Sequence, residues 1–172
     1  MKLDRQLESW LAAQLVEWKQ FAHLTDRVRV TPVDDDKAPR RYVAQFDCRG
    51  LLRHDNGEVT TFDTFLAAIQ FGEDHLSRVD PLRLVWMLSP PGLFHPNVKD
   101  SRVCLGHLPP GVGLVDIIYQ LYSIVTFQNY NLRSYLNEAS AVWVRDHLSE
   151  LPVDARPLKR REFEIHMMEV EQ

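Results

Sequence analysis

The chain has 172 residues, of which 20 are basic and 24 are acidic, so its formal net charge is −4. With 45% hydrophobic and 26% charged residues, its composition is typical of a folded domain, and a chain of this length can bury roughly two thirds of its unfolded surface in one core. The acidic balance disfavours general nucleic-acid binding, which depends on clustered Lys and Arg.

Membrane insertion and secretion are also disfavoured. The most apolar long stretch, residues 113–127, is interrupted by Asp116, Gln120 and Ser123 and is shorter than the about 20 residues that a spanning helix needs. The first five residues, Met-Lys-Leu-Asp-Arg, lack the apolar core of a signal peptide. Two cysteines, Cys48 and Cys104, are too few for a disulfide scaffold or a Cys-only zinc site. We therefore expect reduced thiols in a cytoplasmic protein.

The first predicted element is an amphipathic helix over residues 4–24. Its apolar residues recur at helical spacing and form one stripe: Leu7, Leu11, Leu15, Trp18 and Ala22. Asp4 is the expected N-cap, and Thr25-Asp26 ends the pattern.

Four strands are predicted next, over residues 27–33, 41–52, 59–71 and 82–88. The second and third flank His54-Asp55-Asn56-Gly57, and Asn-Gly is a strong signal for a hairpin turn. The fourth, Leu-Arg-Leu-Val-Trp-Met-Leu, is a nearly continuous apolar run typical of a buried strand.

An irregular segment follows between Ser89-Pro90-Pro91-Gly92 and Pro109-Pro110-Gly111, and helical spacing returns at residues 114–125 and 138–148. This order predicts an α+β fold: an N-terminal helix, a four-stranded antiparallel sheet, an active-site loop and C-terminal helices. We expect one domain over residues 1–150. Residues 151–172 form a charged tail in which Phe163, Ile165 and Met167 alternate, as in a strand or a partner-dependent arm.

The irregular segment carries the residues best suited to chemistry. It contains His95-Pro96-Asn97 and then Cys104, and Pro96 stiffens the backbone between the two polar side chains. A thiolate is a nucleophile, and a rigidly held amide N–H can stabilise the oxyanion that forms when a thioester carbonyl is attacked. Such an arrangement is a workable site for acyl transfer.

Phe-His-Pro-Asn-Val, followed shortly by Val-Cys-Leu, resembles the active-site signature of ubiquitin-conjugating enzymes, and the order of elements over residues 4–148 resembles their fold, the UBC fold. The resemblance implies that Cys104 accepts a ubiquitin-like protein from an activating enzyme as a thioester and passes it to an amine of a target protein. Asn97 would support the oxyanion or the loop beneath it, and His95 would be structural. No cofactor is implied, since the acyl group arrives already activated.

The sequence departs from the common family pattern in three places. Asn97 and Cys104 are one residue closer together, the Trp that usually follows the cysteine is absent, and the acid near the incoming lysine has only Glu138 and the adjacent Asn137 as candidates. In the family, basic residues on the first helix often contact the activating enzyme, which makes Lys2 and Arg5 candidates for that contact. By analogy, these features resemble divergent bacterial members from ubiquitin-like conjugation operons, some of them linked to antiviral defence.

Several alternatives remain open. His95 could be a general base for the thiol, and Cys104 with His107 could form the catalytic pair of a hydrolase. A metal site of His95, Cys104 and His107 is disfavoured, because zinc normally takes a fourth ligand. Cys48 lies in a predicted strand, where a buried and inert thiol is expected. The whole chain could instead be a non-catalytic UBC-like module that scaffolds a conjugation complex, although such modules typically lack the cysteine.

Overall fold

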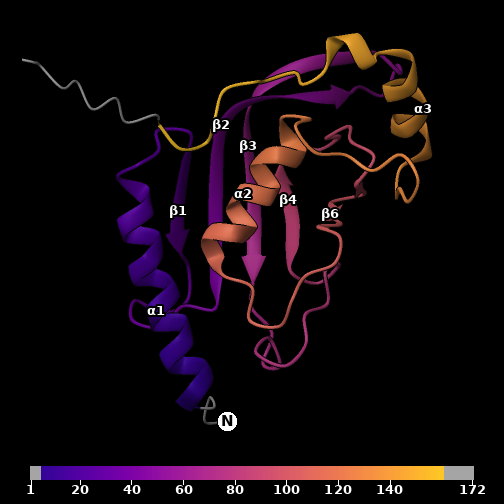
Figure 1. Ribbon diagram of the computed structural model, residues 1–172. Coiled ribbons are helices and arrows are strands. Elements are labelled where there is room, and N and C mark those ends of the chain that lie inside the picture. The colour runs from indigo at the N-terminus through magenta and orange to yellow at the C-terminus, as the bar shows by residue number, and fades with distance from the viewer. Residues whose placement is uncertain (1–4, 161–172) are drawn as a thin grey trace, which may run out of the picture.

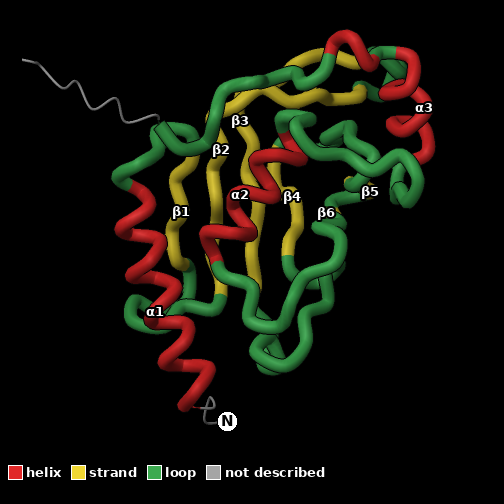
Figure 2. The backbone as a smooth tube through the Cα atoms, in the orientation of Figure 1, coloured by secondary structure: helices red, strands yellow, loops and turns green. Residues whose placement is uncertain are grey.

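The computed structural model describes residues 5–160, which form an α+β fold of three α-helices and a six-stranded antiparallel sheet (Figures 1 and 2). The strand order in the sheet is β1-β2-β3-β4-β6-β5. The strands are β1 Val28–Pro32, β2 Arg41–Arg53, β3 Val59–Gln70, β4 Val85–Ser89, β5 Val98–Lys99 and β6 Arg102–Val103. The helices are α1 Arg5–Ala22, α2 Leu114–Val125 and α3 Glu138–Asp146, followed by a 3-10 turn at Leu148–Glu150.

Helix α1 confirms the predicted apolar stripe. Leu7, Leu11, Leu15 and Trp18 are buried, Ala22 is partly buried, and Phe21 joins them. Gln14 is also buried, and its Oε1 accepts a hydrogen bond of 2.8 Å from the backbone N–H of Leu114 at the start of α2. The first helix therefore supplies the partner that the unsatisfied N-terminus of the second helix needs.

The predicted hairpin is confirmed. Strands β2 and β3 pair in register from Arg41 opposite Gln70 to Arg53 opposite Val59, with a shift between Asp47 and Gly50. Gly57 in the turn has φ +86°, a conformation that glycine adopts without strain. Gly50 has a different reason to be glycine, because a Cβ there would lie 2.9 Å from the carbonyl oxygen of Val125.

The sheet has two strands more than the four predicted. Residues 98–103 form a hairpin of two-residue strands that extends the sheet beyond β4, with Trp86 opposite Arg102. Strands this short leave too few positions for an alternating pattern to be visible in sequence. The fourth strand also begins later than predicted, because Asp80 accepts a hydrogen bond from Leu82 N–H and holds residues 80–83 in a turn.

Helix α2 is apolar on nearly all sides and lies across the sheet, packed against α1 and β2 (Figure 1). The chain after α3 returns over the top of the sheet towards α1 (Figure 1). Leu158 is buried there, and Arg160 N–H donates to Leu24 O at 2.8 Å. The part of the predicted tail up to residue 160 therefore packs against the domain, whereas the alternating Phe163, Ile165 and Met167 lie outside the described residues.

Among residues 5–160, no helix combines the length and apolarity that crossing a membrane requires.

Candidate functional site

Cys104 lies in the loop directly after β6 and is partly exposed. Its backbone N–H donates a hydrogen bond of 2.8 Å to Asn97 O, so the peptide that carries the thiol is fixed to the base of the β5–β6 hairpin. The hairpin turn holds Asp100 at φ 54° and Ser101 at φ 132°, backbone conformations that are strained for residues with a Cβ. Within the described residues, no hydrogen-bond partner lies on the Cys104 sulfur.

His95 is completely buried and has both ring nitrogens occupied. Nδ1 accepts from Asn97 N–H at 3.0 Å, so Nε2 carries the proton and donates to Asn129 O at 3.1 Å. The ring also packs against Phe127, with the centroids 4.5 Å apart. Burial lowers the pKa of His95 to about 3, which keeps the ring neutral. This arrangement holds the loop and leaves no ring nitrogen for the Cys104 thiol, so a general-base role for His95 has no geometric support.

Asn97 is the centre of the hydrogen-bond network around Cys104. Its side-chain Nδ2 donates to Cys104 O at 3.2 Å, and its Oδ1 accepts from Asn131 N–H at 3.1 Å. An amide nitrogen carries two N–H groups, and the Cys104 carbonyl uses one of them. Within the described residues, no hydrogen bond occupies the second.

A segment of which the sequence analysis singled out only the last residue, Asn137, completes this network. The chain after α2, residues 127–137, returns to the His95–Asn97 loop, where Pro96 O accepts from the N–H groups of Leu136 and Asn137. Asn131 Oδ1 accepts from the N–H groups of Arg133 and Ser134 and fixes the turn. The asparagines in Gln128-Asn129-Tyr130-Asn131 were the available signal, since Asn side chains often stabilise turns in this way.

Cys48 is in a different environment. It lies on β2, is 1% exposed and belongs to the main hydrophobic core. Burial, with a further contribution from the Asp154 carboxylate, raises the pKa of its thiol to about 12. The expectation of a buried thiol at this position is confirmed.

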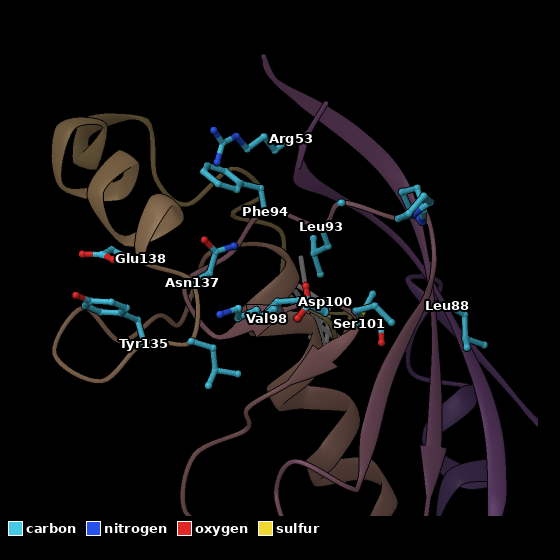
Figure 3. A pocket seen from close by; sticks show the side chains of 16 residues that line it. Arg53, Leu88, Leu93, Phe94, Val98, Asp100, Ser101, Tyr135, Asn137 and Glu138 are labelled. Atoms are coloured by element: carbon cyan, nitrogen blue, oxygen red, sulfur yellow. The ribbon is translucent and has the colours of Figure 1, made fainter. Parts of the chain in front are cut away.

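The two acceptor-side candidates lie in a cavity of about 840 Å³ between the end of β4, the β5–β6 hairpin and the start of α3. Figure 3 shows Asn137 and Glu138 on one side of it and Leu88 on the other. Asn137 is the N-cap of α3 and accepts from Ser140 N–H at 3.1 Å, whereas Glu138 is exposed. Cys104 does not line this cavity. The backbone N–H of Asn137 donates to Pro96 O, next to Asn97, whereas no hydrogen bond in the described residues links Glu138 to Cys104.

The remaining candidates do not join the site. His107 is exposed and no hydrogen bond links it to Cys104 within the described chain, so the Cys–His pair of a hydrolase is not assembled. No group of three or more His, Cys, Asp or Glu in residues 5–160 could hold a metal ion. Arg5 is the exposed first residue of α1. Lys2 lies outside the described residues.

The site therefore consists of the partly exposed Cys104 thiol on a hydrogen-bonded loop and the Asn97 side-chain amide, which donates to the Cys104 carbonyl. No family model and no curated protein matches this sequence.

Proposed function

We propose that the protein is a ubiquitin-conjugating-type transferase that carries a ubiquitin-like modifier on Cys104. The observation that carries the proposal is the reciprocal pairing of Asn97 and Cys104: Cys104 N–H donates to Asn97 O, and Asn97 Nδ2 donates to Cys104 O. A nucleophile and an oxyanion donor must be fixed relative to each other before the carbonyl is attacked. The two hydrogen bonds hold the Cys104 backbone and the Asn97 side chain in one fixed arrangement.

The first step is an exchange of thioesters. The Cys104 thiolate attacks the modifier's terminal carbonyl, a new S–C bond forms, and the S–C bond to the activating enzyme breaks, which returns that enzyme's thiol. In the second step an amine of the target attacks the same carbonyl, an amide bond forms and the Cys104 thiol is released. The second N–H of Asn97 would stabilise the oxyanion of the tetrahedral intermediate in this second step.

The order of elements and the departures from the common family pattern support a divergent UBC-like member, and we propose a bacterial conjugation operon with a role in antiviral defence as its setting. The activating enzyme and the modifier would then be encoded beside this protein. This chemistry requires three protein partners: the activating enzyme, the modifier and the target protein. Neither step calls for a metal or an organic cofactor.

Charging with the modifier is the test. With its activating enzyme, ATP and the modifier, the wild-type protein should form an adduct that a thiol reductant removes. Cys104→Ala should abolish the adduct and Cys48→Ala, the matched control, should retain it. Cys104→Ser should give an adduct that resists reductant, because a hydroxyl is a poorer leaving group than a thiol. An adduct that survives in Cys104→Ala would refute the proposal, and binding of the modifier without any adduct would favour the non-catalytic scaffold.

A further inference from the structure

A second cavity, of about 730 Å³, lies beside the connection between β3 and β4 and shares no lining residue with the cavity at α3. Its polar walls carry three arginines, Arg78, Arg83 and Arg102. We name it the arginine groove. Arg102 is on β6, two positions before Cys104, so the groove adjoins the hairpin that directly precedes the thiol.

The arginines of the arginine groove have fewer carboxylate partners than most other arginines in residues 5–160. Most arginines in residues 5–160 have a carboxylate or an aromatic ring as partner. In the described part of the chain, no carboxylate lies within ion-pair distance of Arg78 or Arg102, and Arg83 is only 3.7 Å from Asp80 in an exposed pair. An exposed pair at this separation contributes little and can exchange partners.

The other charged and titratable groups of the arginine groove leave it positive. Asp74 and Asp80 are its two carboxylates, against three guanidinium groups. His75 adds no charge, since its ring is buried, its Nε2 lies 2.9 Å from Val112 O, and burial lowers its pKa. A positive groove on a chain with net charge −4 is a local feature, and guanidinium groups pair with carboxylates in a bidentate geometry that favours them over other polar groups.

The floor of the arginine groove is partly apolar. Val79, Leu82 and the half-buried Trp86 line it, and Trp86 stands opposite Arg102 in the β4–β6 pair. A ligand that consisted of phosphate alone would use the arginines and leave this apolar surface exposed. A peptide that combines acidic and apolar side chains uses both.

We propose that the arginine groove binds an acidic peptide segment of a partner protein, whose carboxylates pair with Arg78, Arg83 and Arg102 while an apolar side chain packs on Trp86. This binding goes beyond the proposed transferase activity and does not depend on it, because it needs no thioester. If both proposals hold, the segment docks next to the hairpin of Cys104 and brings its protein to the thiol.

A fluorescent heptapeptide, Asp-Glu-Glu-Leu-Asp-Glu-Glu, serves as the probe, and its anisotropy is measured with the full-length protein at low ionic strength. We expect binding that weakens as salt is raised from about 50 mM to about 300 mM, because exposed charge pairs are screened. Arg78→Ala/Arg102→Ala should weaken binding at least tenfold, with a nearly unchanged melting temperature because, within residues 5–160, neither side chain makes a hydrogen bond or an ion pair. Arg133→Ala removes another exposed arginine, which has no ion pair within residues 5–160 and lies outside the groove, and it should leave binding unchanged.

A variant with reversed charges tests whether binding depends on charge complementarity. Arg78→Glu/Arg102→Glu should lose the acidic peptide and gain the peptide with Lys in place of Asp and Glu. Equal binding of the acidic peptide by the wild-type protein and the double alanine variant would overturn the proposal. So would tighter, Arg102-dependent binding of inorganic phosphate or a single-stranded RNA, or a dimer of the wild-type chain that the double alanine variant dissociates. Charging at Cys104 is scored separately, so failure of one proposal does not decide the other.

Discussion

Cys48 and Cys104 carry the same side chain in two parts of the molecule, a central strand and the loop after β6, and their surroundings differ. Cys48 lies in the middle of a long strand, 1% exposed, with a thiol pKa of about 12. Cys104 follows a two-residue strand, is partly exposed, and has its peptide fixed by Asn97 on both its N–H and its carbonyl. A core-facing position on a long central strand buries the Cys48 thiol, whereas the loop after a short hairpin at the sheet edge exposes the Cys104 thiol while Asn97 holds its backbone.

The largest effect expected from this contrast is in thiol reactivity, and it requires no partner protein. Iodoacetamide should alkylate Cys104 in the native protein. It should alkylate Cys48 more than about 10²-fold more slowly, because only an accessible thiolate reacts. Peptide mass spectrometry after timed quenching measures both sites in one sample, and unfolding in urea should equalise them. Similar native rates at the two thiols would break the comparison.

The next largest effect is expected at Asn97. Asn97→Asp retains the Oδ1 that accepts from Asn131 N–H and removes both side-chain N–H donors. Loading of Cys104 should persist, whereas single-turnover discharge to lysine should slow by about 10²–10³, the usual cost of one oxyanion donor.

Asn131→Ala is the matched control for this change, because it loosens the turn at residues 131–134 but leaves the Asn97 donors in place. We expect less than a tenfold change in its discharge rate. Melting curves of both variants complete the test: slow discharge in Asn131→Ala, or slow discharge in Asn97→Asp together with a large fall in melting temperature, would assign Asn97 to loop order alone.

Acid should loosen the Cys104 region before the Cys48 region. The pKa of His95 is about 3 in the folded protein and about 6.5 in an unfolded chain. The unfolded state therefore binds more protons, so this contribution to stability is complete above pH 6.5 and is lost as the pH falls towards 3. Between pH 7 and pH 5 the free energy of unfolding should fall by about 2 kcal/mol from this group.

Urea titrations at several pH values measure this dependence. His95→Asn should be less stable at neutral pH but should show a flatter slope between pH 7 and pH 5. His75, whose pKa burial also lowers, contributes a remaining slope in the same direction. An identical slope in wild type and His95→Asn would show that His95 is not held neutral by its loop.

The smallest effect is expected beside Cys48. Burial raises the pKa of Asp154, but the hydrogen bonds and charge of Arg156 and the N–H of Arg49 outweigh it and lower the value to about 2. Asp154→Asn should reduce the free energy of unfolding at pH 7 by about 1 kcal/mol, a modest value because Arg156 is half exposed. Chemical denaturation gives this value. Charging at Cys104 should be unaffected, and a loss of charging would mean that the two regions are coupled.

The sequence by itself determined the elements that carry strong periodicity or turn chemistry. The apolar stripe of α1, the β2–β3 hairpin at Asn56-Gly57 and the apolar helix α2 all lie close to their expected positions. Periodicity reports which face is buried, and Asn-Gly reports a backbone conformation, so both are local properties that a single chain reveals. The burial of Cys48 followed from the same strand pattern.

Only the tertiary structure decided how the site is assembled. The two-residue strands β5 and β6 exist because β4 offers an edge to pair with. The hydrogen bond that fixes Asn97 Oδ1 comes from the backbone N–H of Asn131, which lies 34 residues away in sequence. Hydrogen bonds between one side chain and backbone groups far away in sequence produce no periodic pattern along the chain. The same holds for the cavity that Glu138 lines and Cys104 does not, and for the cavity that Arg78 and Arg102 line together, because each depends on how loops from different parts of the chain pack against the sheet.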